Sequence, residues 1–130
     1  TVLIHYESDF DLKQIISQVK QKNKKIGFVI NPETPVTVLF EFLDEIDQVL
    51  IMTVKPGFYG SKFLPEMTEK IKELRKRKPS LDIEVDGGIT SETIGLVHDA
   101  GANLFVSGSF IVKADDPGQS IETLKKIITE

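Results

Sequence analysis

The residues best suited to chemistry come directly after five apolar segments of the sequence. They fall into five short groups: His5-Tyr6-Glu7, Asn31-Pro32-Glu33, Lys55-Pro56-Gly57-Phe58-Tyr59-Gly60, Asp86-Gly87-Gly88 and Ser107-Gly108-Ser109. If the apolar segments are parallel strands joined by helices, all five groups lie at the carboxyl ends of those strands. β/α proteins carry their working groups at that edge of the sheet. We therefore predict a single functional site there.

Asp86 is the strongest candidate for a catalytic residue. It follows Ile83, Glu84 and Val85, so its carboxylate lies at the end of a buried strand, where it has to be paired, hydrogen-bonded or metal-bound. Proton transfer and metal ligation both suit a carboxylate at this place, and the alternative is that Asp86 only braces the glycine turn that follows. Glu84 shares the same face of the strand, and we expect it to pair with a polar group of a neighbouring strand.

Glycines after the last two apolar segments indicate a phosphate site. Gly87-Gly88 ends one segment and Gly108-Ser109 ends the next. Backbone N–H groups approach a phosphate most closely where no Cβ intervenes, and the N-terminus of a following helix adds a favourable dipole. The last two strands of barrel enzymes often hold a phosphate in this way. The alternative is that these glycines only form tight turns.

The two histidines do not predict a metal centre by themselves. His5 lies at a strand end, where an imidazole can bind a divalent metal. It is three strands away from Asp86, however, so a polar contact at the mouth of the barrel is the favoured interpretation. His98 falls beside Val97 in a helical pattern, and we expect it on the outer surface.

Two alternating kinds of segment must position these groups. Apolar, β-branched runs predict buried parallel strands at residues 2–6, 26–30, 49–54, 81–85 and 104–107. Apolar residues at helical spacing predict helices between them: Leu12, Ile15, Ile16 and Val19; Leu39, Phe42, Leu43 and Ile46; Leu64, Met67, Ile71 and Leu74; Ile94 and Val97, ended by Gly101; and Ile121, Leu124, Ile127 and Ile128. Thr34-Pro35 and Asp116-Pro117 each place a capping side chain before a proline at the first helical position.

The strand–helix order recurs five times and predicts an α/β fold. Short repeats of this kind form either a doubly wound sheet or a phosphate-binding TIM-type (β/α)8 barrel. A complete barrel takes about 250 residues. The 130 residues, with about five βα units, therefore cannot close a barrel, and we expect them to form a single domain.

The composition argues against several other classes of function. The net charge of −4 does not favour a nucleic-acid partner, and no apolar run approaches the ~20 residues of a membrane span. The absence of cysteine removes disulfides, thiolate nucleophiles and Cys-based zinc sites. The first residues do not resemble a signal peptide, so we expect a cytoplasmic protein. The basic run at residues 70–78 is expected to be a solvated helix face.

Taken together, the motifs resemble the ribulose-phosphate 3-epimerase family. Residues 52–63 are similar to the family's flexible loop, residues 83–89 to its strand-7 motif, and residues 106–109 to its strand-8 motif. His5-x-Glu7 resembles the strand-4 segment, and residues 27–32 resemble the strand-5 segment. The resemblance covers essentially the whole chain in order. It implies a single partial β/α barrel domain, residues 1–130, that corresponds to the C-terminal portion of a TIM-type (β/α)8 barrel, strands 4 to 8.

The resemblance also implies specific roles. Asp86 matches an aspartate that is both a metal ligand and one of two acid/base carboxylates, and Met52 matches a methionine that lines the reaction site. The residues that match the loop closing over substrate are Gly57, Phe58, Tyr59 and Gly60. The residues that match the phosphate cradle are Gly87, Gly88, Gly108 and Ser109.

The reaction implied by the resemblance is the epimerisation of a pentulose phosphate. The family removes the C3 proton of D-ribulose 5-phosphate, and a metal-stabilised enediolate forms. A proton then returns on the opposite face to give D-xylulose 5-phosphate. The implied cofactor is a divalent metal ion (zinc, iron, manganese or cobalt), and the implied partner is a sugar phosphate.

The sequence departs from the family pattern in two ways. Lys55 and Tyr59 stand where the family more often has an asparagine or acidic residue and a small residue. The strands that supply the second carboxylate and the metal-binding histidines of the family have no counterpart in these residues. We therefore expect residues 1–130 alone to be inactive, and either to self-associate as a homo-oligomer through open sheet edges or to need an N-terminal half. The alternatives are an allulose 6-phosphate 3-epimerase and a truncated, non-catalytic half-barrel that binds phosphate or another subunit.

Overall fold

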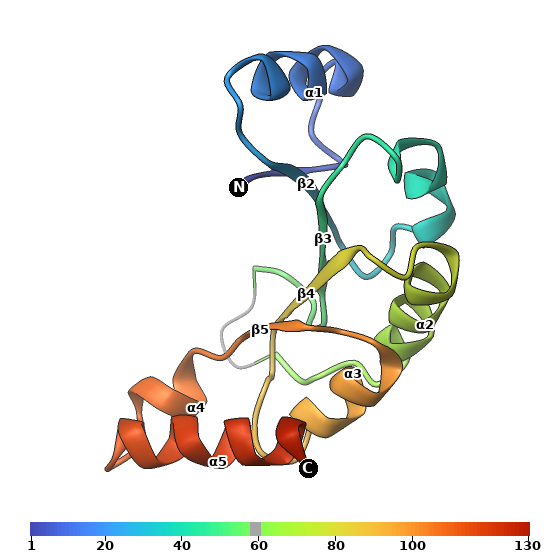
Figure 1. The fold of residues 1–130 in the computed structure, drawn as a ribbon. Coiled ribbons are helices and arrows are strands. Elements are labelled where there is room, and N and C mark those ends of the chain that lie inside the picture. Colours follow the sequence, from blue (N-terminus) through green and yellow to red (C-terminus); the bar gives the residue numbers. More distant parts are fainter. Residues whose placement is uncertain (58–60) are drawn as a thin grey trace.

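Five parallel strands, each followed by a helix, form the fold (Figure 1). The computed structural model describes residues 1–57 and 61–130. The elements in chain order are β1 (Val2–His5), α1 (Leu12–Gln21), β2 (Ile26–Ile30), the 3-10 helix η1 (Val36–Phe42), β3 (Gln48–Met52), α2 (Met67–Arg77), β4 (Asp82–Asp86), α3 (Ile94–Ala100), β5 (Leu104–Val106), α4 (Ser109–Val112) and α5 (Pro117–Thr129). The strands pair in sequence order, β1-β2-β3-β4-β5, each parallel to the next. Every carboxyl end therefore reaches the same edge of the sheet.

The sheet is curved, and the helices follow its outer side (Figure 1). Helix α1 packs against β2, and α2 packs against both β3 and β4. Helix α3 lies between α2 and α5, and α4 packs against α5. A curved parallel sheet with helices along its outer side is the wall of a β/α barrel.

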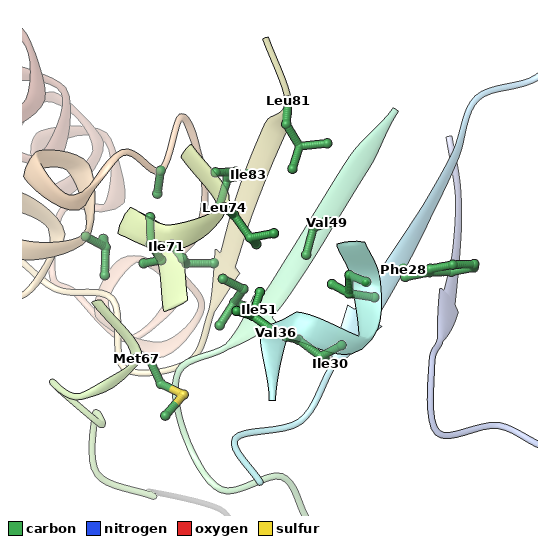
Figure 2. Close-up of a cluster of buried hydrophobic side chains, with 14 of the residues drawn as sticks. Phe28, Ile30, Val36, Val49, Ile51, Met67, Ile71, Leu74, Leu81 and Ile83 are labelled. Carbon is green, nitrogen blue, oxygen red and sulfur yellow. The ribbon is translucent and has the colours of Figure 1, made fainter. Parts of the chain in front are cut away.

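The hydrophobic core lies between the sheet and these helices (Figure 2). Successive strand residues point to opposite faces, and the positions that face the helices are apolar and fully buried. The strand residues among them with no exposed surface are Ile26, Phe28, Ile30, Val49, Ile51, Ile83 and Val85. Ile71 and Leu74 of α2 meet them from the helix layer and are also fully buried. Burying each such side chain contributes about 1.5–3 kcal/mol relative to leaving it exposed.

The inner face of the sheet is more polar and more open. By the alternation along each strand it carries Gln48, Leu50 and Met52 of β3 and Asp82, Glu84 and Asp86 of β4. Leu3 of β1 and Leu104 and Val106 of β5 lie on the same face, and each is 37% exposed. This face carries Asp86, so it is the face on which a site can form.

The five predicted strands are confirmed, with small shifts at their ends. The strand at residues 26–30 has the predicted limits. The strand predicted at 49–54 spans Gln48–Met52, and the chain bends at Val54. The strand predicted at 81–85 is displaced by one residue to Asp82–Asp86, which makes Asp86 its last residue.

One predicted helix is wrong in type and position. The pattern Leu39, Phe42, Leu43 and Ile46 predicted a helix capped by Thr34, whereas the structure has the 3-10 helix η1 with Pro35 at its N-cap and no side-chain cap. The hydroxyl of Thr34 instead donates to Glu7 Oε1 at 2.6 Å. The β-branched and aromatic residues of this segment also have low helix propensity.

The other helix signals are confirmed in outline. Asp116 caps α5 by accepting from the Gln119 N–H at 3.0 Å, and Gly101 ends α3 with φ of +121°. Helix α2 begins at Met67 rather than at Leu64, and the short helix α4 was not predicted. None of the described helices is both long and apolar enough to cross a membrane.

The basic run at residues 70–78 was predicted to be a solvated helix face, and this holds only for part of it. Lys70 donates to the backbone carbonyls of Pro32 and Thr34, and Lys78 donates to that of Leu43. The Arg75 guanidinium donates to three further carbonyls, those of Pro79, Leu81 and Gly101. These long side chains therefore tie α2 to the segments around it, while Lys72 and Lys76 remain exposed.

Candidate active site

The carboxyl ends of the strands bring the predicted site residues into one row. Met52 is the register partner of Asp86, and Asp86 is the partner of Val106. Asn31 follows the β2 residue that pairs with Ile51, so it continues the row on the other side of Met52. Phe58, Tyr59 and Gly60 were predicted to close over substrate, and they lie outside the described residues.

Asp86 is half-buried at the end of β4. In the described part of the chain its carboxylate has no hydrogen-bond or ion-pair partner, while its backbone carbonyl accepts from the Thr53 N–H at 2.9 Å. Burial raises the pKa of the Asp86 carboxyl above its ordinary value. A partly buried acid with a raised pKa can exchange a proton closer to neutral pH than a free carboxylate can.

Gly87 and Gly88 form a turn that only glycine fits. Both have positive φ, +124° and +67°. A Cβ on Gly87 would lie 2.5 Å from Val54 Cγ2, and a Cβ on Gly88 would lie 2.9 Å from Phe63 Cβ. The turn is therefore packed closely against the two ends of the segment that follows β3.

Gly108 begins the turn after the neighbouring strand and is open on its outer side. It is the N-cap of α4 with φ of −97°, and a Cβ there would have no neighbour within 4 Å. Ser107 joins the two turns, because its hydroxyl donates to the Ile89 carbonyl at 2.8 Å. Among the described residues the N–H groups of Gly88 and Gly108 have no acceptor. The predicted residues thus lie on adjacent strand ends with free donors.

A second layer of polar side chains lies one step below Asp86 on the inner face. Gln48 Nε2 donates to Glu84 Oε2 at 2.5 Å, and Gln48 is only 8% exposed. The predicted structural pairing of Glu84 with a neighbouring strand is confirmed. Glu84 is therefore hydrogen-bonded within the sheet rather than free at the carboxyl ends of the strands.

A polar network at the ends of β1 and β2 was missed by the sequence interpretation. Glu7 Oε1 accepts from the Asn31 N–H at 2.7 Å as well as from Thr34, and Lys70 holds the other side of the same turn. Burial would raise the pKa of Glu7, but the hydrogen bonds from Thr34 and Asn31 outweigh it and lower the pKa. Burial lowers the pKa of Lys70, against the opposing charges of Glu33 and Glu7. No spacing rule links Glu7 to a lysine more than sixty positions away, so no sequence signal could have found this network.

The histidines behave as predicted. His5 is exposed at the end of β1, with Nδ1 3.5 Å from Glu7 Oε2. His98 is exposed on α3, with Nδ1 3.6 Å from Asp99 Oδ1. Neither packs with Asp86.

The described residues alone do not fit a metal centre. Residues 1–57 and 61–130 contain no group of three or more histidine, aspartate or glutamate side chains that could hold an ion. Asp86 offers one carboxylate, and its neighbour Glu84 is already bound by Gln48. A divalent metal at Asp86 would need further ligands from elsewhere.

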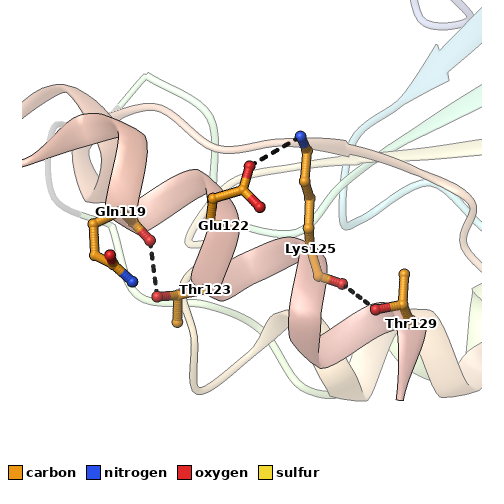
Figure 3. A network of polar contacts seen from close by, with 5 residues as sticks. All are labelled: Gln119, Glu122, Thr123, Lys125 and Thr129. Carbon is orange, nitrogen blue, oxygen red and sulfur yellow. Dashed lines mark hydrogen bonds and ion pairs between the residues drawn. The ribbon is translucent and has the colours of Figure 1, made fainter.

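An open hollow of about 740 Å³ lies along α5, away from the strand ends. Its lining side chains make ordinary contacts within one helix (Figure 3). Thr123 and Thr129 each donate to a carbonyl four residues earlier at 2.9 Å, and Lys125 pairs with Glu122 at 3.2 Å. Exposed pairs of this kind contribute little free energy, and the surface has no converging polar groups that suggest a ligand.

Most of the sequence resembles a known protein family. The model of the family described as "Ribulose-phosphate 3 epimerase family" matches residues 1–112. This chain belongs to that family. The predicted resemblance is therefore confirmed over most of the chain.

Individual members of the ribulose-phosphate 3-epimerase family show the extent of the match. The ribulose-phosphate 3-epimerase of Candida glabrata is 43% identical over 122 residues, which is 94% of this chain and 50% of that protein. The cytoplasmic isoform of Oryza sativa is 45% identical over 89% of this chain and 52% of its own length, and the Bacillus subtilis enzyme is 42% identical over 94% and 58%. The chain spans about half the length of the curated relatives it matches.

Two solved structures share the fold of this chain. The 3-hexulose-6-phosphate synthase of Salmonella typhimurium superposes with a TM-score of 0.74 at 19% identity, covering 98% of this chain and 61% of that one. The 3-keto-L-gulonate-6-phosphate decarboxylase of Vibrio cholerae gives 0.62 at 16% identity, covering 88% and 53%. At these identities the likeness concerns the fold alone, and it supports an α/β fold of TIM type.

Proposed function

We propose that this chain carries the Asp86 side of a ribulose-phosphate 3-epimerase active site, which interconverts D-ribulose 5-phosphate and D-xylulose 5-phosphate. The observation that carries the proposal is the position of Asp86. It is a half-buried carboxyl with a raised pKa, on the inner face and at the carboxyl end of β4, directly before the Gly87-Gly88 turn. An acid/base group beside an anion-binding turn suits proton transfer on a sugar phosphate.

In this mechanism Asp86 transfers a proton at C3 on one face of the sugar. Its raised pKa lets the carboxyl take up a proton and release it again during turnover. Epimerisation needs a second acid/base group on the opposite face. Because Glu84 is engaged by Gln48, we assign that second role to a group outside the described residues.

The phosphate of the substrate would bind at the two glycine turns. The N–H groups of Gly88 and Gly108 face no acceptor among the described residues, and Ser109 follows at the start of α4. Oriented N–H groups and glycine turns form anion-binding concavities. Gly108 has open space where a side chain would stand, which leaves room for the phosphate to approach.

The remaining roles follow the family and stay within this proposal. Met52 is the register partner of Asp86 and would line the reaction site, and Gly57 would belong to the loop over the substrate. Asp86 would be one ligand of a divalent metal ion, whose positive charge would favour proton removal from the substrate, and the remaining ligands would come from outside the described residues. A cytoplasmic location and a homo-oligomeric state complete the proposal, and the Oryza sativa relative is itself named a cytoplasmic isoform.

The test compares the turnover of D-ribulose 5-phosphate by the full-length protein and by its Asp86→Asn variant. We expect turnover to fall by about 10²- to 10⁴-fold, because one acid/base group is lost while the shape of the side chain is kept. Thermal unfolding of both proteins gives the control for folding. Turnover within tenfold of wild type would remove Asp86 from the mechanism, and turnover only with a hexulose 6-phosphate would redirect the proposal to a six-carbon substrate.

A further inference from the structure

Thr53 is a fully buried polar residue that the proposed mechanism does not use. It follows β3 directly and has no exposed surface. Its N–H donates to the Asp86 carbonyl at 2.9 Å, and its hydroxyl donates to the Gly87 carbonyl at 2.6 Å. Its own carbonyl accepts from the Leu64 N–H at 2.8 Å. One residue therefore binds the carbonyls of two successive peptide groups, Asp86–Gly87 and Gly87–Gly88.

Thr53 also joins the two ends of the segment that follows β3, through its bond from the Leu64 N–H. Residues 54 and 63, at the two ends of that segment, press on the glycine turn, since Val54 Cγ2 and Phe63 Cβ occupy the space where the Cβ atoms of Gly87 and Gly88 would stand. The Leu64 bond to Thr53 brings the returning chain to the same point. Asp86, the glycine turn and both ends of the segment thus meet at Thr53.

We propose that Thr53 is a positioning residue that sets the direction of the Asp86 carboxylate and of the Gly88 N–H through its bonds to the Asp86 and Gly87 carbonyls. The inference rests on the proposed function, because it assigns Thr53 to the same site. Its hydroxyl is specific for this task. The backbone of Thr53 already binds the Asp86 carbonyl, so the hydroxyl adds a second attachment one residue further. The two bonds hold two successive peptide planes, Asp86–Gly87 and Gly87–Gly88, and the second of these planes carries the Gly88 N–H.

The Thr53 hydroxyl should affect how accurately Asp86 and the Gly88 N–H are placed, and not only how tightly the substrate binds. Without the hydroxyl, the partly buried Gly87 carbonyl loses its donor, and the turn can rotate about the single remaining bond to Asp86. A misplacement of about 1 Å at a catalytic group can cost about 10²-fold in rate. A purely structural threonine would instead lower the stability of the fold and leave the rate per folded molecule unchanged.

The experiment compares Thr53→Val, Thr53→Ser and Thr68→Val in the full-length protein. Valine removes the hydroxyl and keeps the branched shape, whereas serine keeps the hydroxyl. Thr68→Val is the matched control, because the Thr68 hydroxyl also donates to a backbone carbonyl, that of Pro65 at 2.8 Å, at the start of α2, and makes no hydrogen bond to residues 86–89. The readouts are kcat and KM with D-ribulose 5-phosphate, and amide hydrogen exchange over residues 86–89.

We expect Thr53→Val to lower kcat by about 10- to 100-fold and to speed exchange at residues 86–89. Thr53→Ser should restore both towards wild type, and Thr68→Val should change neither. Unchanged exchange in Thr53→Val would overturn the inference, whether or not the protein is active. Faster exchange with normal kcat, while Asp86→Asn is inactive, would overturn the positioning role and leave the proposed function standing. Absence of epimerase activity in the wild type would overturn the proposed function and, with it, the catalytic part of this inference.

Discussion

Gln48 and Glu84 are joined side chain to side chain across neighbouring strands on the inner face of the sheet, one step below Asp86. The 2.5 Å bond from Gln48 Nε2 to Glu84 Oε2 lies where Gln48 is only 8% exposed. Buried polar groups are stable when they are paired and costly when one partner is removed. The pair therefore adds a paired polar layer to the inner face, next to the strand ends that carry Met52 and Asp86.

Removal of one partner of the Gln48–Glu84 pair should destabilise the fold. Glu84→Ala leaves the Gln48 amide without its acceptor, and we expect the free energy of unfolding to fall by about 1–3 kcal/mol. Urea denaturation gives the measurement. The control is the double variant Gln48→Leu with Glu84→Leu, which replaces both partners by apolar groups and should cost less than the single change. Equal losses in the two proteins would contradict the role assigned to the pair.

The Glu7 network predicts a loss of stability in acid. The pKa of Glu7 is lowered in the folded protein, so its contribution is present above the unfolded value of 4.5 and is lost as the pH falls through the folded value below it. We expect wild type to be more stable than Glu7→Gln at pH 7, with the difference shrinking below about pH 4.5. Denaturation at a series of pH values measures it. Glu41→Gln, at an exposed position of η1, is the matched control for the loss of one carboxylate.

The two glycine turns should respond differently to a methyl group. Gly87 has φ of +124°, and a Cβ there would meet Val54 at 2.5 Å, so Gly87→Ala should lower the free energy of unfolding by about 1–3 kcal/mol for the backbone strain alone. Gly108 has ordinary φ and open space, so Gly108→Ala should unfold close to wild type. Thermal unfolding decides between them. A similar loss in both variants would show that the open position is also packed.

A larger side chain at Gly108 should weaken phosphate binding, although the position tolerates a methyl group in the fold. Gly108→Val places a branched side chain in the space that the proposed phosphate would enter, so binding should weaken more than folding does. Calorimetric titration with inorganic phosphate measures the affinity, and thermal unfolding measures the fold. Affinity equal to wild type would move the phosphate site away from this turn.

The sequence predicted those parts of the fold that depend on local pattern. The buried strands were evident because continuous apolar runs mark a covered parallel sheet, and Asp86 was evident because a carboxylate directly follows one such run. Helix η1 was missed because its apolar spacing fits a helix, whereas the Thr34 hydroxyl that should have capped it binds Glu7, 27 positions earlier. The contacts of Lys70 and Thr53 were beyond reach for the same reason, since they join segments that only the fold brings together.

Residues 1–130, produced as an isolated polypeptide, should self-associate. β1 and β5 are the outer strands of the sheet, so each offers backbone donors and acceptors along one side. The inner face adds apolar surface near both edges, because Leu3, Leu104 and Val106 are each 37% exposed. Exposed apolar surface beside an unpaired strand favours pairing with another chain, so light scattering should find a dimer or a larger assembly.

A charge on that surface should reduce the association without disturbing the helix layer. Leu104→Lys places an ammonium at the β5 edge, where pairing would desolvate it, and should shift the assembly towards monomer. Leu96→Lys is the control, because Leu96 is 51% exposed on α3, in the outer helix layer, and should leave the assembly unchanged.

The isolated polypeptide should also be inactive with D-ribulose 5-phosphate in the presence of added zinc, iron or manganese, since the described residues offer Asp86 without a complete ligand set. A coupled assay measures the turnover, and light scattering of the same sample measures its size. A monodisperse monomer with full turnover would contradict both the expected self-association and the expected inactivity, because it would require a closed sheet and a complete site within these 130 residues.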